Sequence, residues 1–323
     1  MNQMLKNLGV SIVLGLLVPY LFLWFGVTLL NRYRIRESSE IPAVTEAIQK
    51  DSAYYPIRFR TGDTVTEMNM DDYLVGVLLA EMPASFEIEA LKAQACVART
   101  YAGKANVTGG KHGDGSVCGE SSCCQGYLAE KSYFAAGGKP ESVDRIRSAV
   151  DATSGQVLIY DGQLIEATYF SCSGGRTEDA VAVWGTDVPY LQAVDSPGEE
   201  QAAYYTDTRV FALSEFAERL NLTMDGEPDS WFGMITYTEG GGVYTMNIGG
   251  ETFTGTQLRS LLELRSTAFS MKADDSGITV TTRGYGHRVG MSQYGADAMA
   301  LAGSSWQEIL THYYLGAEIT MLS

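Results

Sequence analysis

The sequence predicts an α+β fold, in which mixed helices and antiparallel hairpins form a cleft, preceded by one transmembrane helix. Three observations support this fold class: an uncharged apolar segment near the N-terminus, two helical patterns on either side of Pro83, and a hairpin signature at Asp161-Gly162. The chain has 323 residues, of which 45% are hydrophobic. This length and composition allow one large domain or two modest ones with a real core.

The predicted anchor is the segment from Leu8 to Leu30, which has 23 residues and no charge. A helix needs roughly 20 apolar residues to cross the hydrocarbon core of a bilayer. The segment is too long for a typical signal-peptide core, and no small-residue cleavage site follows it. We therefore expect an uncleaved anchor in residues 1–36, a polar stalk in 37–55 and one folded domain in 56–323.

Two aspects of the charge distribution bear on the partners and the orientation of the chain. Residues 1–36 contain four basic residues and no acid, so the remainder carries 19 basic and 39 acidic residues, a balance of −20. A domain of this charge repels nucleic acid, and an anionic ligand would need a local basic pocket. The arginines at 32, 34 and 36 outweigh Lys6, so the positive-inside rule alone would place the domain in the cytoplasm.

Glu81 stands out because it ends an apolar run, "YLVGVLLAEMP". Asp71 or Asp72 can cap a helix that runs to about Ala80, and Pro83 forces the preceding residue out of helical geometry. The negative end of the helix dipole and apolar neighbours would both raise the pKa of Glu81, as a general acid requires. The alternative is that the side chain simply points into water.

The segment "FEIEALKAQACVARTYAGKA", residues 86–105, predicts a helix with a narrow alanine-rich face that packs closely on another element. Lys92 and Arg99 are seven residues apart, two turns along one face. Two cations on one face of an acidic domain could bind an anion, because a guanidinium can form two hydrogen bonds to a carboxylate. The alternative is a pair of surface cations that interact with Glu87 or Glu89.

Three potential metal ligands occur in a glycine-rich loop: His112, Cys118 and Cys124 are spaced as His-x5-Cys-x5-Cys. Thiolate and imidazole converging on such a loop suggest zinc. A disulfide of Cys118 with Cys123 or Cys124 is the other interpretation, since an exported domain can be oxidised. The chain contains five cysteines, and an odd number argues against a complete disulfide framework.

The later part of the chain contains three further signals. "QVLIY", Asp161-Gly162 and "QLIEATYFS" predict a hairpin with a type I′ turn. The second strand leads into Ser171, Cys172, Ser173 and two glycines, which let the backbone approach a ligand. Residues 214–222 and 256–264 predict short amphipathic helices in an α+β insertion, and Ser305-x-x-Glu308 is a capping box that opens a final helix.

Residues 277–303 predict a strand, a glycine loop and a helix, with His287, Gln293 and Tyr294 in the loop and at the start of the helix. Aromatic faces and amide hydrogen bonds are common in carbohydrate sites, and Tyr285, Gln293 and Tyr294 suit such a site. The alternative is a structural turn that packs against the core. The spacing is not a dinucleotide-binding fingerprint, because no βαβ unit follows.

Four motifs, taken together, resemble the stage II sporulation protein D family: "DDYLVGVLLAEMP", "EALKAQACVARTYA", "YFSCSGGRTED" and "GYGHRVGMSQYGA". The resemblance extends from about Pro56 to the C-terminus, and the anchor and the histidine–cysteine loop look like the sporulation member, in its clostridial form. It implies a lytic transglycosylase that acts on peptide-stripped peptidoglycan glycan strands, with Glu81 as the sole acid and base. It also implies a set of substrate-binding residues, namely Lys92, Gln94, Arg99, Tyr169, Ser171, Ser173, His287, Gln293 and Tyr294.

The resemblance further implies a zinc ion, chiefly structural, on His112, Cys118 and Cys124, with the fourth ligand open between Cys123, Cys172, a water and a carboxylate. It places the domain outside the cytoplasm, in the mother-cell membrane facing the forespore. The implied partners are a peptide-stripping amidase, stage II sporulation protein P, and a membrane protein, stage II sporulation protein M.

Two other functions are compatible with the sequence. Relatives of the family enhance a cell-wall amidase without cleaving glycan, and Glu81 would then only contact a ligand. A metallohydrolase that uses the histidine and the cysteines is a third interpretation, although ligands within one short loop favour a structural clip.

Overall fold

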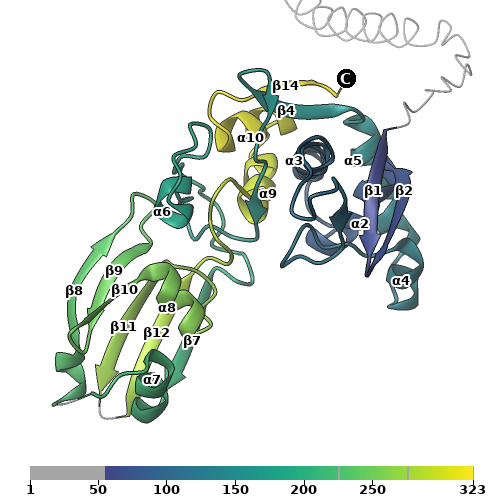
Figure 1. Cartoon of the computed structure of the whole chain (residues 1–323). Coiled ribbons are helices and arrows are strands. Elements are labelled where there is room, and N and C mark those ends of the chain that lie inside the picture. Colours follow the sequence, from purple (N-terminus) through teal and green to yellow (C-terminus); the bar gives the residue numbers. More distant parts are fainter. Residues whose placement is uncertain (1–54, 225, 275, 323) are drawn as a thin grey trace, which may run out of the picture. The chain divides into compact units, whose positions relative to one another are not determined.

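The computed structural model describes residues 55–224, 226–274 and 276–322 (Figure 1). The chain divides into two units, Met1–Ser52 and Ala53–Ser323. Because the described residues begin at 55, the predicted anchor, Leu8–Leu30, and nearly all of the predicted stalk lie outside them. Within the part of the chain that the structure describes, no helix has both the length and the apolar character that a membrane span requires.

The fold is α+β with mainly antiparallel sheets, as the sequence predicts. The helices of this unit are α2 (Met70–Glu81), α3 (Ile88–Thr108), α4 (Glu130–Ala135), α5 (Pro140–Ala152), α6 (Ala180–Trp184), α7 (Leu213–Leu220), η1 (Pro228–Trp231), α8 (Gly255–Leu261), α9 (Gln293–Leu301) and α10 (Trp306–Tyr313). The strands are β1 (Pro56–Thr61), β2 (Thr64–Asn69), β3 (Val117–Cys118), β4 (Gln156–Tyr160), β5 (Gln163–Leu164), β6 (Tyr169–Phe170), β7 (Thr206–Phe211), β8 (Phe232–Tyr237), β9 (Val243–Ile248), β10 (Glu251–Thr254), β11 (Phe269–Asp274), β12 (Gly277–Arg283), β13 (Met291–Ser292) and β14 (Glu318–Met321).

Helix α3 lies at the centre of the larger hydrophobic core and contacts α2, α5, α9, α10 and strand β4. Its small residues are fully buried, which confirms the close packing that the alanine pattern predicts: Ala90, Ala93, Ala95, Ala98 and Ala102. Small side chains let helix axes approach closely, so several elements can pack on this one helix. The Glu81 end of α2 and the loop after α3 are thereby fixed to a rigid support.

The segment from β7 to β12 is an insertion with its own sheets, β11–β12–β7 and β10–β9–β8. Figure 1 shows these strands with the short helices α7 and α8. A second hydrophobic core belongs to this insertion and contains, among others, Phe211, Phe216, Trp231, Leu258 and Ile278. The two amphipathic helices predicted at 214–222 and 256–264 are confirmed with shifts of one to three residues.

The predicted hairpin is confirmed at its turn and corrected in its second strand. Asp161 and Gly162 have φ values of 49° and 74°, the two positive angles of a type I′ turn. The second strand, β5, is only two residues long. The chain then leaves this sheet, because Thr168 accepts a hydrogen bond from the Met291 amide and the following residues pair in parallel with β13.

Candidate functional site

Glu81 is the last residue of α2, and its side chain is half-buried. The helix is capped by Asn69, whose side chain accepts a hydrogen bond from the Asp71 amide, so the predicted cap at Asp71 or Asp72 is wrong by two or three residues. Met82 is extended, with φ −130°, as expected for a residue that precedes proline. The local sequence therefore ends the helix at the carboxylate.

Two hydrogen-bonding groups hold the Glu81 carboxyl group. The Gly126 amide donates to Oε1 at 2.6 Å, and the Tyr169 hydroxyl forms the second hydrogen bond. Burial raises the pKa of Glu81, while these two hydrogen bonds oppose the shift. No second carboxylate of the described residues contributes to the shift. The direction agrees with the sequence prediction, and its main cause is desolvation.

Gln125 lies beside both groups that hold Glu81, because it precedes Gly126 in the chain and hydrogen-bonds to Tyr169. Its amide nitrogen donates to the Tyr73 hydroxyl at 3.0 Å, and its amide oxygen accepts from the Tyr169 hydroxyl at 3.2 Å. The side chain is 1% exposed. A tyrosine hydroxyl has one proton to donate, so Tyr169 can donate to Gln125 while a protonated Glu81 donates to Tyr169. This arrangement accommodates both protonation states of the carboxyl group.

Four potential metal ligands lie just before Gln125 and Gly126 in the chain: His112, Cys118, Cys123 and Cys124. Their ligand atoms all lie within 4.8 Å of one another. The His112 Nε2 atom is 3.8 Å from the Cys123 sulfur and 3.6 Å from the Cys124 sulfur, and the two sulfurs are 3.9 Å apart.

These separations fit the edges of a zinc tetrahedron. Zn–S bonds of about 2.3 Å and Zn–N bonds of about 2.0 Å give edges of about 3.8 Å between sulfurs and about 3.5 Å between sulfur and nitrogen. Three cysteines and one histidine are a common structural zinc set. All five cysteines are free thiols in the structure, so neither of the disulfides considered above is formed. Cys123 joins the predicted set as a fourth potential ligand, a choice that the spacing alone left open.

The position of Arg99 contradicts the expectation that it contacts substrate. Its side chain is fully buried, and it forms an ion pair with Asp71 at 2.9 Å. The Nη1 atom donates to the backbone carbonyls of Thr153 and Gln156, while the buried Nε atom has no hydrogen-bond partner among the described residues. Arg99 thus joins the start of α2 to the end of α5 and the start of β4. A buried guanidinium needs such partners, and no donor is directed to solvent.

Lys92 and Gln94 lie on α3 in different surroundings. Lys92 forms an ion pair with Glu89 at 2.6 Å, which is the surface pairing that the sequence left as an alternative. Gln94 is fully buried, and neither polar atom of its amide has a hydrogen-bond partner among the described residues. A buried amide without partners is costly, so this side chain is available to a polar ligand group.

Ser173 is buried and is held by Glu199, a carboxylate that sequence reasoning missed. The Glu199 Oε2 atom accepts hydrogen bonds from the Ser173 hydroxyl and amide, both at 2.8 Å, and from the Gly174 amide at 2.9 Å. Its Oε1 atom accepts from Ser196 and Ser292. Ser173 therefore orders the glycine loop, and this contradicts its expected direct contact with substrate.

The remaining predicted residues gather around the parallel pair of β6 and β13. The Tyr294 amide donates to the Ser171 carbonyl at 3.0 Å, and the Tyr294 ring lies 5.0 Å from that of Phe86. Gln293 is 6% exposed, and its side-chain nitrogen has no hydrogen-bond partner in the described part of the chain. The side-chain amide nitrogens of Gln94 and Gln293 are thus both buried donors without an acceptor among the described residues.

His287 is half-buried between aromatic rings, 5.5 Å from Phe170 and 5.4 Å from Trp184, measured between ring centroids. Burial, and next the charge of Arg259, lower its pKa to about 4. The imidazole is therefore neutral at pH 7. In this state it can form hydrogen bonds but does not supply a positive charge to an anion.

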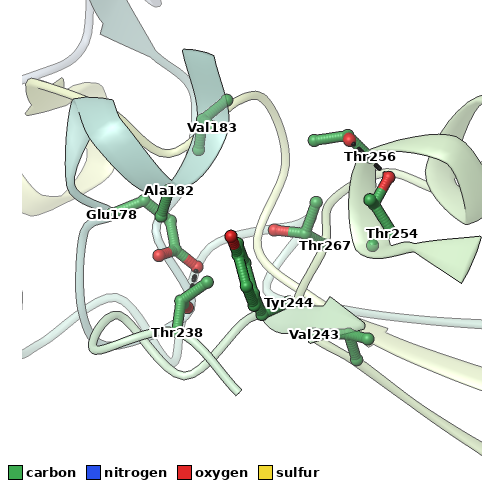
Figure 2. Close-up of a pocket in the computed structure, with 10 residues that line it drawn as sticks. Glu178, Ala182, Val183, Thr238, Val243, Tyr244, Thr254, Thr256 and Thr267 are labelled. Carbon is green, nitrogen blue, oxygen red and sulfur yellow. Dashed lines mark hydrogen bonds between the residues drawn. The ribbon is translucent and has the colours of Figure 1, made fainter. Parts of the chain in front are cut away.

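A pocket of about 60 Å³ lies where the insertion meets the main core, and Figure 2 shows Tyr244 in it between Glu178 and Thr267. The Glu178 carboxylate is bound by Arg288 at 2.9 Å and by Thr238 at 2.9 Å. The lining contains four threonines and no residue of the predicted site. This pocket belongs to a structural junction, and the acid in it is already paired.

Comparisons with known proteins identify the family of this chain. Residues 60–160 match the family described as SpoIID, stage II sporulation protein. The chain is 37% identical to stage II sporulation protein D of Bacillus subtilis (strain 168), over 85% of this chain and 81% of the relative. It is 35% identical to the protein of the same name from Bacillus amyloliquefaciens, over 87% and 83%. An amidase enhancer of B. subtilis is 30% identical over 76% of this chain and 40% of the relative. The chain belongs to the stage II sporulation protein D family.

Proposed function

We propose that this protein is a lytic transglycosylase that cleaves peptide-stripped glycan strands of peptidoglycan during engulfment in sporulation. The observation that carries the proposal is the environment of Glu81. A single carboxyl group with a raised pKa is held by one amide and one hydroxyl, with no second carboxylate among the influences on its pKa. Most glycosidases need two carboxyl groups, whereas a lytic transglycosylase can work with one.

The proposed reaction uses Glu81 twice. Protonated Glu81 donates its proton to the glycosidic oxygen, and the bond between that oxygen and the anomeric carbon of muramic acid breaks. The 6-hydroxyl of the same sugar then attacks the anomeric carbon and returns its proton to the carboxylate. The product is a 1,6-anhydro sugar, and no water enters the reaction. A raised pKa supports the first step, because it keeps the acid form populated.

Two neighbours suit the return of the proton. After the first step Glu81 is an anion, and the Gly126 amide and the Tyr169 hydroxyl are the groups that stabilise it. Hydrogen bonds to a carboxylate are stronger than bonds to a neutral acid. The same two groups fix the orientation of the carboxyl group, and geometric fixation is itself a large part of catalysis.

We propose that His112, Cys118, Cys123 and Cys124 hold one zinc ion, chiefly for structure. The support is the set of separations, which match a zinc tetrahedron, and the absence of a disulfide among these thiols. When bound, zinc supplies a cross-link rather than chemistry. Gln125 and Gly126 follow the last ligand directly, so the cross-link would order the loop that holds Glu81.

The compartment and the partners remain proposals that follow from the family. The substrate of a peptidoglycan enzyme lies outside the cytoplasmic membrane. We therefore propose a single-pass protein of the mother-cell membrane with its domain facing the forespore. We propose as partners the amidase stage II sporulation protein P, which would strip the peptides, and the membrane protein stage II sporulation protein M.

A second function is supported by the similarity to the amidase enhancer. In that case the site would bind glycan or an amidase without cutting, and Glu81 would be a ligand contact. The two functions differ in a simple way, because only the enzyme changes the glycan when no other protein is present.

The test is mass spectrometry of peptide-free glycan incubated with the purified chain. We expect products that end in 1,6-anhydro-muramic acid and take up no heavy oxygen from labelled water. Glu81→Gln should reduce turnover by about 10²- to 10⁴-fold. Glu141→Gln, a change at an exposed position at the start of α5, is the matched control. Labelled sugar ends would indicate a hydrolase. A protein that leaves the glycan unchanged but stimulates an amidase would be the enhancer.

A further inference from the structure

An aromatic and basic cluster around Tyr285 lies where the loop after β12 meets the insertion. Tyr204 and Tyr285 are each 42% exposed, and their ring centroids are 5.4 Å apart at an interplanar angle of 72°. The Arg265 guanidinium lies over both rings, 4.8 Å from the Tyr204 centroid and 5.6 Å from that of Tyr285. Two exposed rings beside a cation offer a ligand both apolar faces and a positive charge.

We propose that Tyr204, Arg265 and Tyr285 form a glycan subsite beyond Glu81, in which Arg265 binds the lactyl carboxylate of a muramic acid unit. This inference rests on the proposed function, because it takes the same polymer as the ligand. The two rings would pack against the apolar faces of the sugars, and the guanidinium would recognise the acid that distinguishes muramic acid from glucosamine.

The cluster is built on backbone hydrogen bonds and is not a chance contact of surface side chains. The Gly286 amide donates to the Arg265 carbonyl at 3.0 Å. Tyr285 and Cys172 exchange a pair of backbone hydrogen bonds, of 2.7 and 3.1 Å. The residue after Tyr204 is held in the same way, since its carbonyl accepts from the Gly284 amide at 2.9 Å. The three chain segments that carry these side chains are thus held to one another, which lowers the entropic cost of binding.

The cluster is connected to Glu81 through one short strand. Tyr169, which contacts Glu81, lies three residues before Cys172, and three residues of extended chain span about 10 Å. Tyr294 also lies beside the cluster, since its amide donates to the Ser171 carbonyl and since burial, and next the neighbouring Tyr204, raise the pKa of its phenol. A glycan that is bound with one glycosidic bond at Glu81 would therefore bring a nearby sugar of the same glycan to Tyr285.

The charge of Arg265 is suited to an acid ligand. The domain has a strongly acidic balance, so a cation with free donors is valuable to an anionic polymer. Asp207 lies 3.3 Å from one guanidinium nitrogen of Arg265, and no other described side chain or carbonyl accepts from the group. The guanidinium is planar and weakly hydrated by its own electronic structure, which favours a two-point hydrogen bond to a carboxylate.

The experiment is calorimetric binding by the full chain carrying Glu81→Gln, with two ligands of equal length. The first is peptide-free glycan with muramic acid, and the second is an N-acetylglucosamine oligomer, which has no carboxylate. Arg265→Gln should weaken binding of the first ligand roughly 10-fold or more, as expected for the loss of a hydrogen bond to a charged group, and leave the second within twofold. Tyr204→Ala should weaken binding of both ligands, since both have sugar faces.

Arg209→Gln is the matched control. Arg209 also lies over a ring, 5.2 Å from the centroid of Phe211, and also interacts with an acid, Glu263, at 3.6 Å. It should leave both affinities unchanged. Equal affinity of Arg265→Gln and its parent for the muramic acid glycan would overturn the proposal, as would an equal loss for both ligands. The proposed function is tested separately by the activity assay. It fails if the Glu81→Gln variant remains active or if the unaltered chain yields no anhydro products.

Discussion

The Gly126 amide and the Glu81 carboxylate lie 2.6 Å apart, and this hydrogen bond joins the end of α2 to the loop that carries the histidine and three cysteines. Gly126 is buried, and a Cβ at this position would lie 2.7 Å from the Glu81 Oε1 atom. Glycine is therefore favoured here by the close approach of the carboxylate oxygen, not by an unusual backbone angle. The contact makes the position of the proposed acid sensitive to any change in the loop.

Gly126→Ala should reduce turnover by about 10²-fold, because a displacement near 1 Å of a catalytic group can cost that much. The added methyl group must displace the carboxylate, because the Ala80 Cβ atom, 3.4 Å away, is only in ordinary contact. Steady-state kinetics on peptide-free glycan, with thermal melting as the measure of folding, tests this effect. Gly103→Ala is the control, since its nearest contact is an ordinary 3.6 Å and it lies inside a helix. Equal activity of the two variants would contradict the prediction.

Tyr169→Phe should shift the alkaline limb of the pH–rate profile to higher pH. The hydroxyl stabilises the Glu81 carboxylate and so lowers its pKa. Its removal leaves burial less opposed, and the pKa rises further. The acid form of Glu81 then persists to a higher pH, and activity is lost later as pH increases. Tyr133→Phe, at a half-exposed position on α4, should leave the profile in place. A shift to lower pH would show that the hydroxyl favours the acid form.

The purified chain should contain one zinc ion, and a chelator should lower its melting temperature, because structural zinc contributes directly to the free energy of folding. Cys123→Ser should reduce the zinc content measured by elemental analysis. Cys96→Ala should keep it, since this buried thiol lies outside the ligand cluster. Full zinc occupancy in Cys123→Ser would mean that a water or a different side chain completes the site.

Arg99→Met should lower the free energy of unfolding by about 3–5 kcal/mol, the range for breaking a buried ion pair by removing one partner. The change leaves Asp71 without its cation and removes the donors of three carbonyls. Urea denaturation measures this loss. Lys92→Met, which breaks a partly exposed pair with Glu89, should cost less, about 1 kcal/mol. If Arg99→Met has unchanged stability but a weaker affinity for glycan, Arg99 binds substrate as the sequence predicted.

The sequence predicts much of the local structure, because the signals are short-range. The helix that ends at Glu81, the I′ turn at Asp161-Gly162 and the capping box at Ser305 and Glu308 depend on residues within one or two turns of one another, and all three are found. The direction of the pKa shift of Glu81 was predictable for the same reason. An apolar run before a proline already implies desolvation.

The parts that could not be predicted depend on contacts between distant residues. Lys92 and Arg99 share a helix and a charge, yet only the tertiary structure reveals that Asp71 binds Arg99 in the interior. Nothing in the sequence distinguishes Glu199 from the other acids of the chain. It can be buried because the hydroxyls of Ser173, Ser196 and Ser292 donate to its carboxylate. Gln125 and Gly126 follow a cysteine pair directly, which was the one available hint that they matter.

The closing strand of the molecule has a consequence for how it is made. Strand β14, the last element, pairs with β4, so residues 318–321 complete a sheet begun at residue 156. The pair of β6 and β13 likewise joins positions about 120 residues apart. Such long-range pairings raise the contact order and delay folding, because the ends of a long loop must meet first. The segment that holds Tyr169 can therefore be completed only after residues 291 and 292 have emerged, so the surroundings of Glu81 are assembled late in synthesis.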